Sequence, residues 1–166
     1  MTTKKKSTLT AINIGINSSH RGKVCELLAT VLADQHVLYI KTRNFHWNLV
    51  GERFHTLHAF YEEQYDTLAL AIDATAERIR MLGGVSPGSM KEFVERASLS
   101  EAKSELIHGE QTINALVEDH EACARKLRKD VDLCDGKYGD AGTADFLTEL
   151  LQKHEQSAWM LRSFLV

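Results

Sequence analysis

Proline is almost absent from this chain: Pro87 is the only one among 166 residues, so little interrupts a helix over long stretches. Cysteine is also scarce. Cys25, Cys123 and Cys134 are odd in number and form no Cys-x-x-Cys pair, which argues against a disulfide framework and favours a reducing compartment. No apolar run approaches the length of a membrane span, and no signal-peptide hydrophobic region is present at the N-terminus. We therefore expect a cytoplasmic protein without a membrane partner.

Positive and negative residues nearly balance in this chain, with 20 Lys and Arg against 23 Asp and Glu. The net charge of −3 predicts no general affinity for polyanions, and 26% charged with 43% hydrophobic residues is ordinary for one soluble domain. The exception is the start of the chain, where no acid precedes Glu26 and five cations occur: Lys4, Lys5, Lys6, Arg21 and Lys23. We expect residues 1–19 to form a flexible basic tail and residues 20–166 to form the folded domain.

Two long helices are predicted in the first half of the chain. Apolar residues recur every three or four positions from Val24 to Phe45, and again from about Phe54 to Leu82. Gly51 separates the two segments, and the pair Gly83-Gly84 is typical of a helix C-terminus. Residues 85–99 contain the only proline and are expected to form a connection, with a short helix at residues 90–96.

Two further helices are predicted in the second half. The sequence Ser98-Leu-Ser-Glu101 resembles a capping box and would begin the third helix, whose apolar positions run from Leu106 to Val131. A polar loop at residues 135–142 leads to the fourth helix, which carries Leu147 to Leu165. Four long helices, each with one apolar stripe, predict an all-α four-helix bundle with a short extra helix between the second and third.

A stripe of potential metal ligands follows the second helix. At about 100° per residue, four side chains fall within one 100° sector: His58, Glu62, Asp73 and Glu77. Along the axis they form two pairs, and His58 and Asp73 are separated by a rise of about 22 Å. One metal ion with ligands at about 2 Å cannot join both pairs within a chain.

An antiparallel copy of the same helix removes this obstacle. With a two-fold axis near Thr67–Leu68, the first pair of one subunit faces the second pair of the other, and each dimer has two equivalent sites. His46 can fold back across Gly51 toward His58. The predicted ligands are His46, His58 and Glu62 from one subunit with Asp73 and Glu77 from the other. Imidazole and carboxylate ligands without thiolate suit iron, with manganese and zinc as competing cations.

Two alternatives compete with this shared site. The same residues would be found on the solvated face of an amphipathic helix. A di-iron site within one bundle would use Glu-x-x-His on two helices, and the chain contains Glu52-x-x-His55 and Glu105-x-x-His108. Glu52, however, follows the break at Gly51 and should lie in a turn. His120 and His154 fall on apolar stripes, where hydrogen-bonded core histidines are expected.

Around the predicted ligands, the sequence resembles the Dps family, the small cage-forming relatives of ferritin. The matching residues are NFHWN at 44–48, Gly51, Phe54, Leu57-His58, Glu62, DATAERI at 73–79 and LGG at 82–84, with a looser match through the C-terminal helix. The resemblance implies a ferritin-like bundle in a hollow shell of twelve subunits. Such shells oxidise Fe(II), preferentially with hydrogen peroxide, at sites between two-fold related subunits and store the ferric mineral inside.

The resemblance assigns the family's ligand roles to the five residues that the helix geometry selected. Many members carry Asp where Glu62 stands, and the longer arm of Glu is expected to alter occupancy of the second, weaker iron position. Trp47 occupies the position of an aromatic beside the iron, where electron donation and plain packing are alternative roles. The family places acidic iron-entry pores near the loop between the third and fourth helices, which makes Asp135 and Asp140 pore candidates; turn formation and helix capping are the alternative.

DNA binding is a separate expectation, carried by the basic tail. Multiplied around a shell, the tail could bind DNA phosphates by avidity and associate the protein with the nucleoid; a disordered solubilising arm is the alternative. Two functions follow from the sequence: a peroxide-consuming ferroxidase and iron store, or a DNA-compacting structural protein with little ferroxidase activity. The complete ligand set favours the ferroxidase.

Overall fold

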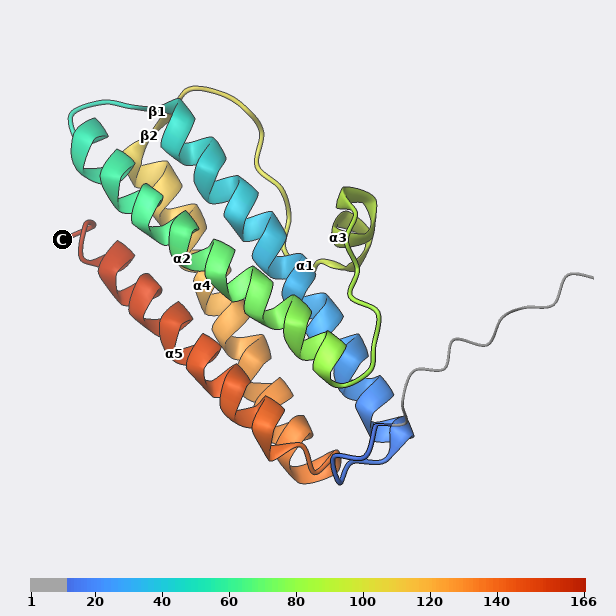
Figure 1. The fold of residues 1–166 in the computed structure, drawn as a ribbon. Coiled ribbons are helices and arrows are strands. Elements are labelled where there is room, and N and C mark those ends of the chain that lie inside the picture. Colours follow the sequence, from blue (N-terminus) through green and yellow to red (C-terminus); the bar gives the residue numbers. More distant parts are fainter. Residues whose placement is uncertain (1–11) are drawn as a thin grey trace, which may run out of the picture.

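Four long helices form an antiparallel bundle in the computed structural model, which describes residues 12–166 (Figure 1). They are α1 (Ser18–Asn48), α2 (Phe54–Met81), α4 (Gly109–Asp132) and α5 (Ala141–Arg162). The short helix α3 (Met90–Arg96) lies against α1 outside the bundle. The predicted all-α bundle with a short extra helix is confirmed.

The first helix begins earlier than its apolar stripe. Asn17 is its N-cap, and the Asn17 side chain accepts a hydrogen bond from the His20 amide at 2.8 Å. Arg21 then ties this end to the rest of the fold by donating to the carbonyl oxygens of Ile16 and Leu82. Ser18 and Ser19, which we assigned to the tail, are therefore helical, while residues 1–11 lie outside the described part.

The predicted end of the second helix is confirmed at Gly83-Gly84. The Gly84 amide donates to Ile79 O and the Gly83 amide to Arg80 O, the paired bonds of a Schellman motif. Gly83 has a φ of +89°, and a β-carbon there would lie 2.5 Å from the Ile12 side chain. Only glycine satisfies both conditions, so the helix stops here and the chain turns into the crossover.

The predicted start of the third helix is wrong. Ser98 caps no helix, because its amide and hydroxyl both donate to the Asp34 carboxylate, at 2.6 and 2.8 Å. The chain continues without helix to the two-residue strand β2 (Ile107–His108), which pairs in parallel with β1 (Leu49–Val50). Leu106 is exposed outside any helix. The Ser98 hydroxyl is therefore bound to Asp34 of α1, which is distant in sequence, and is not available to cap a helix that starts locally.

The junction before the last helix is shorter than predicted. Residues 133–137 form one turn of π-helix, so only Tyr138 to Asp140 separate it from α5. The α1–α2 and α4–α5 hairpins then pack together with two apolar clusters inside, one toward each end of the bundle. Between these clusters, at mid-height, the core is polar: Gln35, His120 and His154 are all buried there.

Candidate metal site

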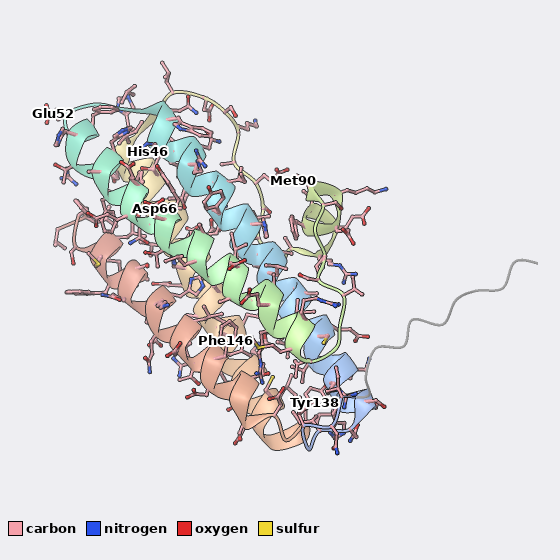
Figure 2. The ribbon with its side chains drawn as sticks, in the orientation of Figure 1. His46, Glu52, Asp66, Met90, Tyr138 and Phe146 are labelled. Atoms are coloured by element: carbon pink, nitrogen blue, oxygen red, sulfur yellow. The ribbon has the colours of Figure 1, made fainter. Side chains whose placement is uncertain are left out.

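His46 and His58 come together where α1 passes into α2. Figure 2 labels His46 at this end of the bundle. Their rings stack with centroids 3.6 Å apart and planes inclined by 18°. The contact exists because β1 and the turn at Gly51 reverse the chain between the two helices; Gly51 has a φ of +110°, which favours glycine. The predicted folding back of His46 toward His58 is therefore what the structure shows.

Each of these rings is held by the backbone of the other residue. Nδ1 of His46 lies 2.8 Å from His58 O, and Nδ1 of His58 lies 2.9 Å from His46 O. A carbonyl oxygen only accepts hydrogen bonds, so each Nδ1 must carry the proton. In the neutral imidazole each Nε2 then keeps its lone pair, which is the tautomer that a histidine binding a metal through Nε2 requires.

Glu62 lies one helical turn beyond His58 on α2 and is exposed. Tyr65 lies close to His46 and to Glu62. Its ring meets His46 edge-on at 5.3 Å, and its pKa is raised by partial burial and then by the negative charge of Glu62. Tyr65 thus borders both the His46 ring and the Glu62 carboxylate, a nitrogen and an oxygen ligand of the predicted set.

An aromatic cluster surrounds the Arg43 guanidinium beside this site. Arg43 lies 4.9 Å from the centre of the Trp47 ring, 5.1 Å from Tyr65 and 5.5 Å from Tyr39, and it donates to the Tyr39 hydroxyl. Trp47 is 59% exposed, so it is not a core residue. We did not select Arg43, Tyr39 or Tyr65 from the sequence. Their helical spacing could have indicated them: Arg43 precedes His46 by three residues, and Tyr65 follows His58 by seven, so each lies on the same helix face as the histidine.

Asp73 and Glu77 lie on the same helix but far from the histidines. The helix α2 is continuous from Phe54 to Met81, so the rise of about 22 Å between His58 and Asp73 holds in the folded chain. Both carboxylates are exposed. Within residues 12–166, no three His, Cys, Asp or Glu side chains come together as a metal site. The chain brings His46 and His58 together, with Glu62 one helical turn from His58, and leaves Asp73 and Glu77 apart.

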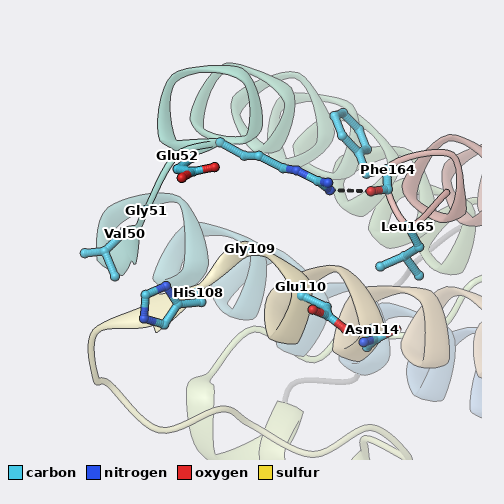
Figure 3. Close-up of a pocket in the computed structure, with 10 residues that line it drawn as sticks. Val50, Gly51, Glu52, His108, Gly109, Glu110, Asn114, Phe164 and Leu165 are labelled. Atoms are coloured by element: carbon cyan, nitrogen blue, oxygen red, sulfur yellow. Dashed lines mark hydrogen bonds between the residues drawn. The ribbon is translucent and has the colours of Figure 1, made fainter.

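The Glu-x-x-His alternative does not form an intrachain bundle site. Glu52 lies in the turn before α2, as expected, and Glu105 precedes β2 outside any helix. Glu52, His108 and Glu110 instead line an open cavity of about 530 Å³ at the end of the bundle (Figure 3). Arg53 also lines this cavity and donates a hydrogen bond to the Phe164 carbonyl oxygen.

The two pore candidates and the two core histidines predicted from the sequence lie elsewhere in the fold. Asp140 is buried as the N-cap of α5, where it accepts from the Thr143 amide and hydroxyl and from Arg78, so the capping alternative is confirmed for it. Asp135 is exposed in the π-helical turn. His120 and His154 are hydrogen-bonded core histidines, as expected, with their Nδ1 atoms 2.9 Å apart.

Comparison with known proteins places these features in one family. The ferritin-like domain family matches residues 25–166. A DNA protection during starvation protein of Bacillus anthracis is 38% identical over 146 residues, which are 86% of this chain and 97% of that protein. An uncharacterised low temperature-induced protein of Nostoc is 46% identical over 154 residues, 93% of this chain and 86% of that protein.

Solved structures agree with the sequence relatives. A Dps protein from Vibrio cholerae, described as a member of the ferritin-like diiron-carboxylate superfamily, superimposes with a TM-score of 0.88 at 32% identity, over 96% of this chain and 100% of that one. A Dps protein from Bacillus brevis gives 0.86 at 33% identity, over 91% and 100%. In the described residues, no helix combines the length and apolarity of a membrane span.

Proposed function

Since this chain belongs to the Dps family of ferritin-like proteins, we propose that it oxidises Fe(II) with hydrogen peroxide and stores the ferric product inside a hollow shell of twelve subunits. The observation that carries the proposal is the His46–His58 pair, whose Nε2 atoms are both free to bind a cation. Iron is the substrate of this site, and zinc is its expected competitor.

The site is completed by a second copy of the chain. An antiparallel α2 around an axis near Thr67–Leu68 sets His58 opposite Glu77, and Glu62 opposite Asp73. The same pairing sets Tyr65 opposite Leu70, an exposed apolar side chain on the outer face of α2. Covering Leu70 gives the two-fold contact an apolar contribution as well as the metal ligands.

The chemistry follows from the ligand types. Two Fe(II) ions held together give two electrons to one hydrogen peroxide, whose O–O bond breaks to leave oxygen at the level of water without free hydroxyl radical. Carboxylates favour Fe(III) over Fe(II), and protons leave as ferric oxyhydroxide forms. Trp47, beside the site and 59% exposed, would supply one electron and one proton when only a single iron is present.

DNA binding belongs to this proposal as a second, weaker activity. The basic residues Lys4 to Lys6 would bind phosphates without reading bases and so place the shell in the cytoplasm on the nucleoid. A DNA-compacting protein with an inactive metal site is the alternative function. The free Nε2 atoms favour the ferroxidase, because a purely structural protein has no need of two imidazoles oriented in this way.

Subunit mixing tests the shared site directly. We expect shells of His46→Ala alone and of Asp73→Ala alone to lose fast, radical-poor oxidation of anaerobically bound Fe(II) after a peroxide pulse. Dissociated and reassembled together in equal amounts, the two variants should regain about one quarter of the wild-type activity, because random pairing restores one site in four.

The matched control mixes His46→Ala with His58→Ala. These substitutions fall in the same half of the site, so no pairing restores it and no activity should return. Recovery in the control mixture as well, or no recovery in either, would refute the shared site. Equal rates in wild type and all single variants would refute the ferroxidase and leave the DNA-compacting alternative.

A further inference from the structure

The bundle core is divided at mid-height by a polar layer that the iron site does not use. Gln35 of α1 is 2% exposed, and neither its Nε2 nor its Oε1 has a hydrogen-bond partner in the described structure. A buried amide without partners destabilises the fold, because it loses its hydrogen bonds to water and gains none in return. Apolar clusters lie on both sides of this layer, so a methionine or leucine would have suited the packing. The amide therefore indicates a polar ligand.

The histidine pair adjoins this layer from the other two helices. His120 of α4 is 2% exposed and His154 of α5 is 5% exposed, with Nδ1 atoms 2.9 Å apart. One Nδ1 must donate and the other accept, so a single proton is shared between the rings. Burial lowers the pKa of both, to about 4 for His154, and each ring is neutral at neutral pH.

Two narrow clefts enter the layer from opposite sides of the bundle. The first, of about 10 Å³, lies between α1 and α4; the polar members of its lining are Gln35, Asp34, Lys126 and His154, and the rest of the lining is apolar. The second, of about 30 Å³, lies between α2 and α5; its lining includes Gln64, Lys153, His120 and His154 together with apolar side chains. Since one water needs roughly 10–15 Å³ by this measure, the first cleft has room for one water and the second for about two, where polar partners are present. His154 lines both clefts and so joins them.

We propose that Gln35 and the His120–His154 pair bind water in these clefts and form a proton passage across the bundle. A proton that arrives at one imidazole is accepted there, the shared Nδ1 proton moves to the other ring, and that ring releases a proton on its far side. One proton enters and one leaves, so neither ring keeps a charge. The Gln35 amide, which donates and accepts, holds the water at the α1–α4 entrance.

The passage opens at the height of the axis proposed for the dimer. Its α2–α5 cleft is lined by Thr67 and Leu68, at the axial midpoint of α2 but on the side of the helix turned away from the predicted ligands. Ferric oxyhydroxide that forms inside a shell releases protons that have to cross the shell wall, and the passage provides a route across it. The link to iron chemistry rests on the proposed function; the hydrated passage itself does not.

Histidine C2 hydrogen exchange in D2O, followed by mass spectrometry on iron-free shells, tests water access. We expect measurable exchange at His120 and His154 and a several-fold slowing in Gln35→Met, which keeps the side-chain size but removes both amide groups. Gln156→Met makes the same change on the exposed face of α5 and should have no effect. No exchange at either histidine, or equal rates in both variants, would overturn the passage.

Stopped-flow proton release tests the activity. External pH-indicator and ferric absorbance signals are recorded together after a peroxide pulse. In Gln35→Met we expect proton appearance to lag behind oxidation while the oxidation rate is unchanged, and no lag in Gln156→Met. Unchanged proton release in Gln35→Met would refute proton conduction. Absence of iron oxidation in wild type would refute the proposed function instead, and the exchange result would still decide the passage.

Discussion

His46 and His58 hold each other in place: the Nδ1 of each ring donates to the main-chain carbonyl oxygen of the other residue, and the rings stack 3.6 Å apart. This reciprocal contact joins the end of α1 to the first turns of α2. The contact fixes the tautomer and the ring position of both histidines in the metal-free protein. Metal binding therefore costs little further side-chain ordering.

Removing one imidazole should weaken cation binding without disturbing the fold. In His58→Ala the backbone acceptor for His46 remains, so His46 stays oriented and only one ligand is lost. We expect Zn(II) affinity of iron-free shells, measured by calorimetry, to fall by at least about ten-fold. His55→Ala, an exposed neighbour on the same helix, is the control and should bind as wild type.

Acid should destabilise the protein through the buried histidines. The pKa of His154 is about 4 in the fold and about 6.5 when unfolded, so this group stabilises the fold above pH 6.5. The stability is lost as pH falls from about 6.5 to about 4, on the order of 3 kcal/mol per subunit for His154. Denaturant unfolding at pH 7 and 4.5 should show a smaller difference in a His120→Leu/His154→Leu variant than in wild type.

The ion pair between Lys41 and Asp119 should matter more than a surface pair. The two side chains are nearly buried and 2.6 Å apart, and burial raises the pKa of Asp119 against the opposing effect of Lys41. Lys41→Met should cost about 3–5 kcal/mol of unfolding free energy, and adding Asp119→Leu should recover most of it. The exposed pair Lys91–Glu95 provides the contrast: Lys91→Met should change stability by less than about 1 kcal/mol.

Replacing Trp47 should separate oxidation from radical control. In Trp47→Phe we expect the initial rate of iron oxidation to stay within about two-fold of wild type, since no ligand is lost. Spin-trapped hydroxyl radical should rise when iron is limiting. Trp159→Phe changes the other exposed tryptophan, on α5, and should leave the radical yield unaltered. Equal yields in both variants would assign Trp47 to packing.

The basic tail should account for DNA retention at low salt. We expect deletion of residues 2–6 to abolish the retardation of linear DNA by shells. A variant in which Lys4, Lys5 and Lys6 are all replaced by Gln keeps the full tail length and should also fail to retard DNA. In wild type, DNA retention should fall steeply as the salt concentration rises. Retention that survives both changes at low salt would exclude the tail as the binding element.

Most of the fold could be predicted because it depends on local patterns. The apolar periodicity, the scarcity of proline and the Gly83-Gly84 stop located α2 almost to the residue, since one amphipathic stripe permits one way of packing. Helix phase alone also placed His58, Glu62, Asp73 and Glu77 on one face, where a metal site that used both pairs would need a second subunit. These properties follow from the rise and rotation of a helix, which do not change with its surroundings.

Long-range contacts decided the rest. The sequence near Ser98 gives no sign that its amide and hydroxyl donate to Asp34 of α1, a contact that prevents the expected helix start. The exchange of hydrogen bonds between His46 and His58, and the polar layer of Gln35, His120 and His154, likewise join helices that are distant along the chain. The sequence by itself determined which residues share a helix face; only the tertiary structure decided which faces meet, because hydrogen-bond partners are chosen by proximity in space.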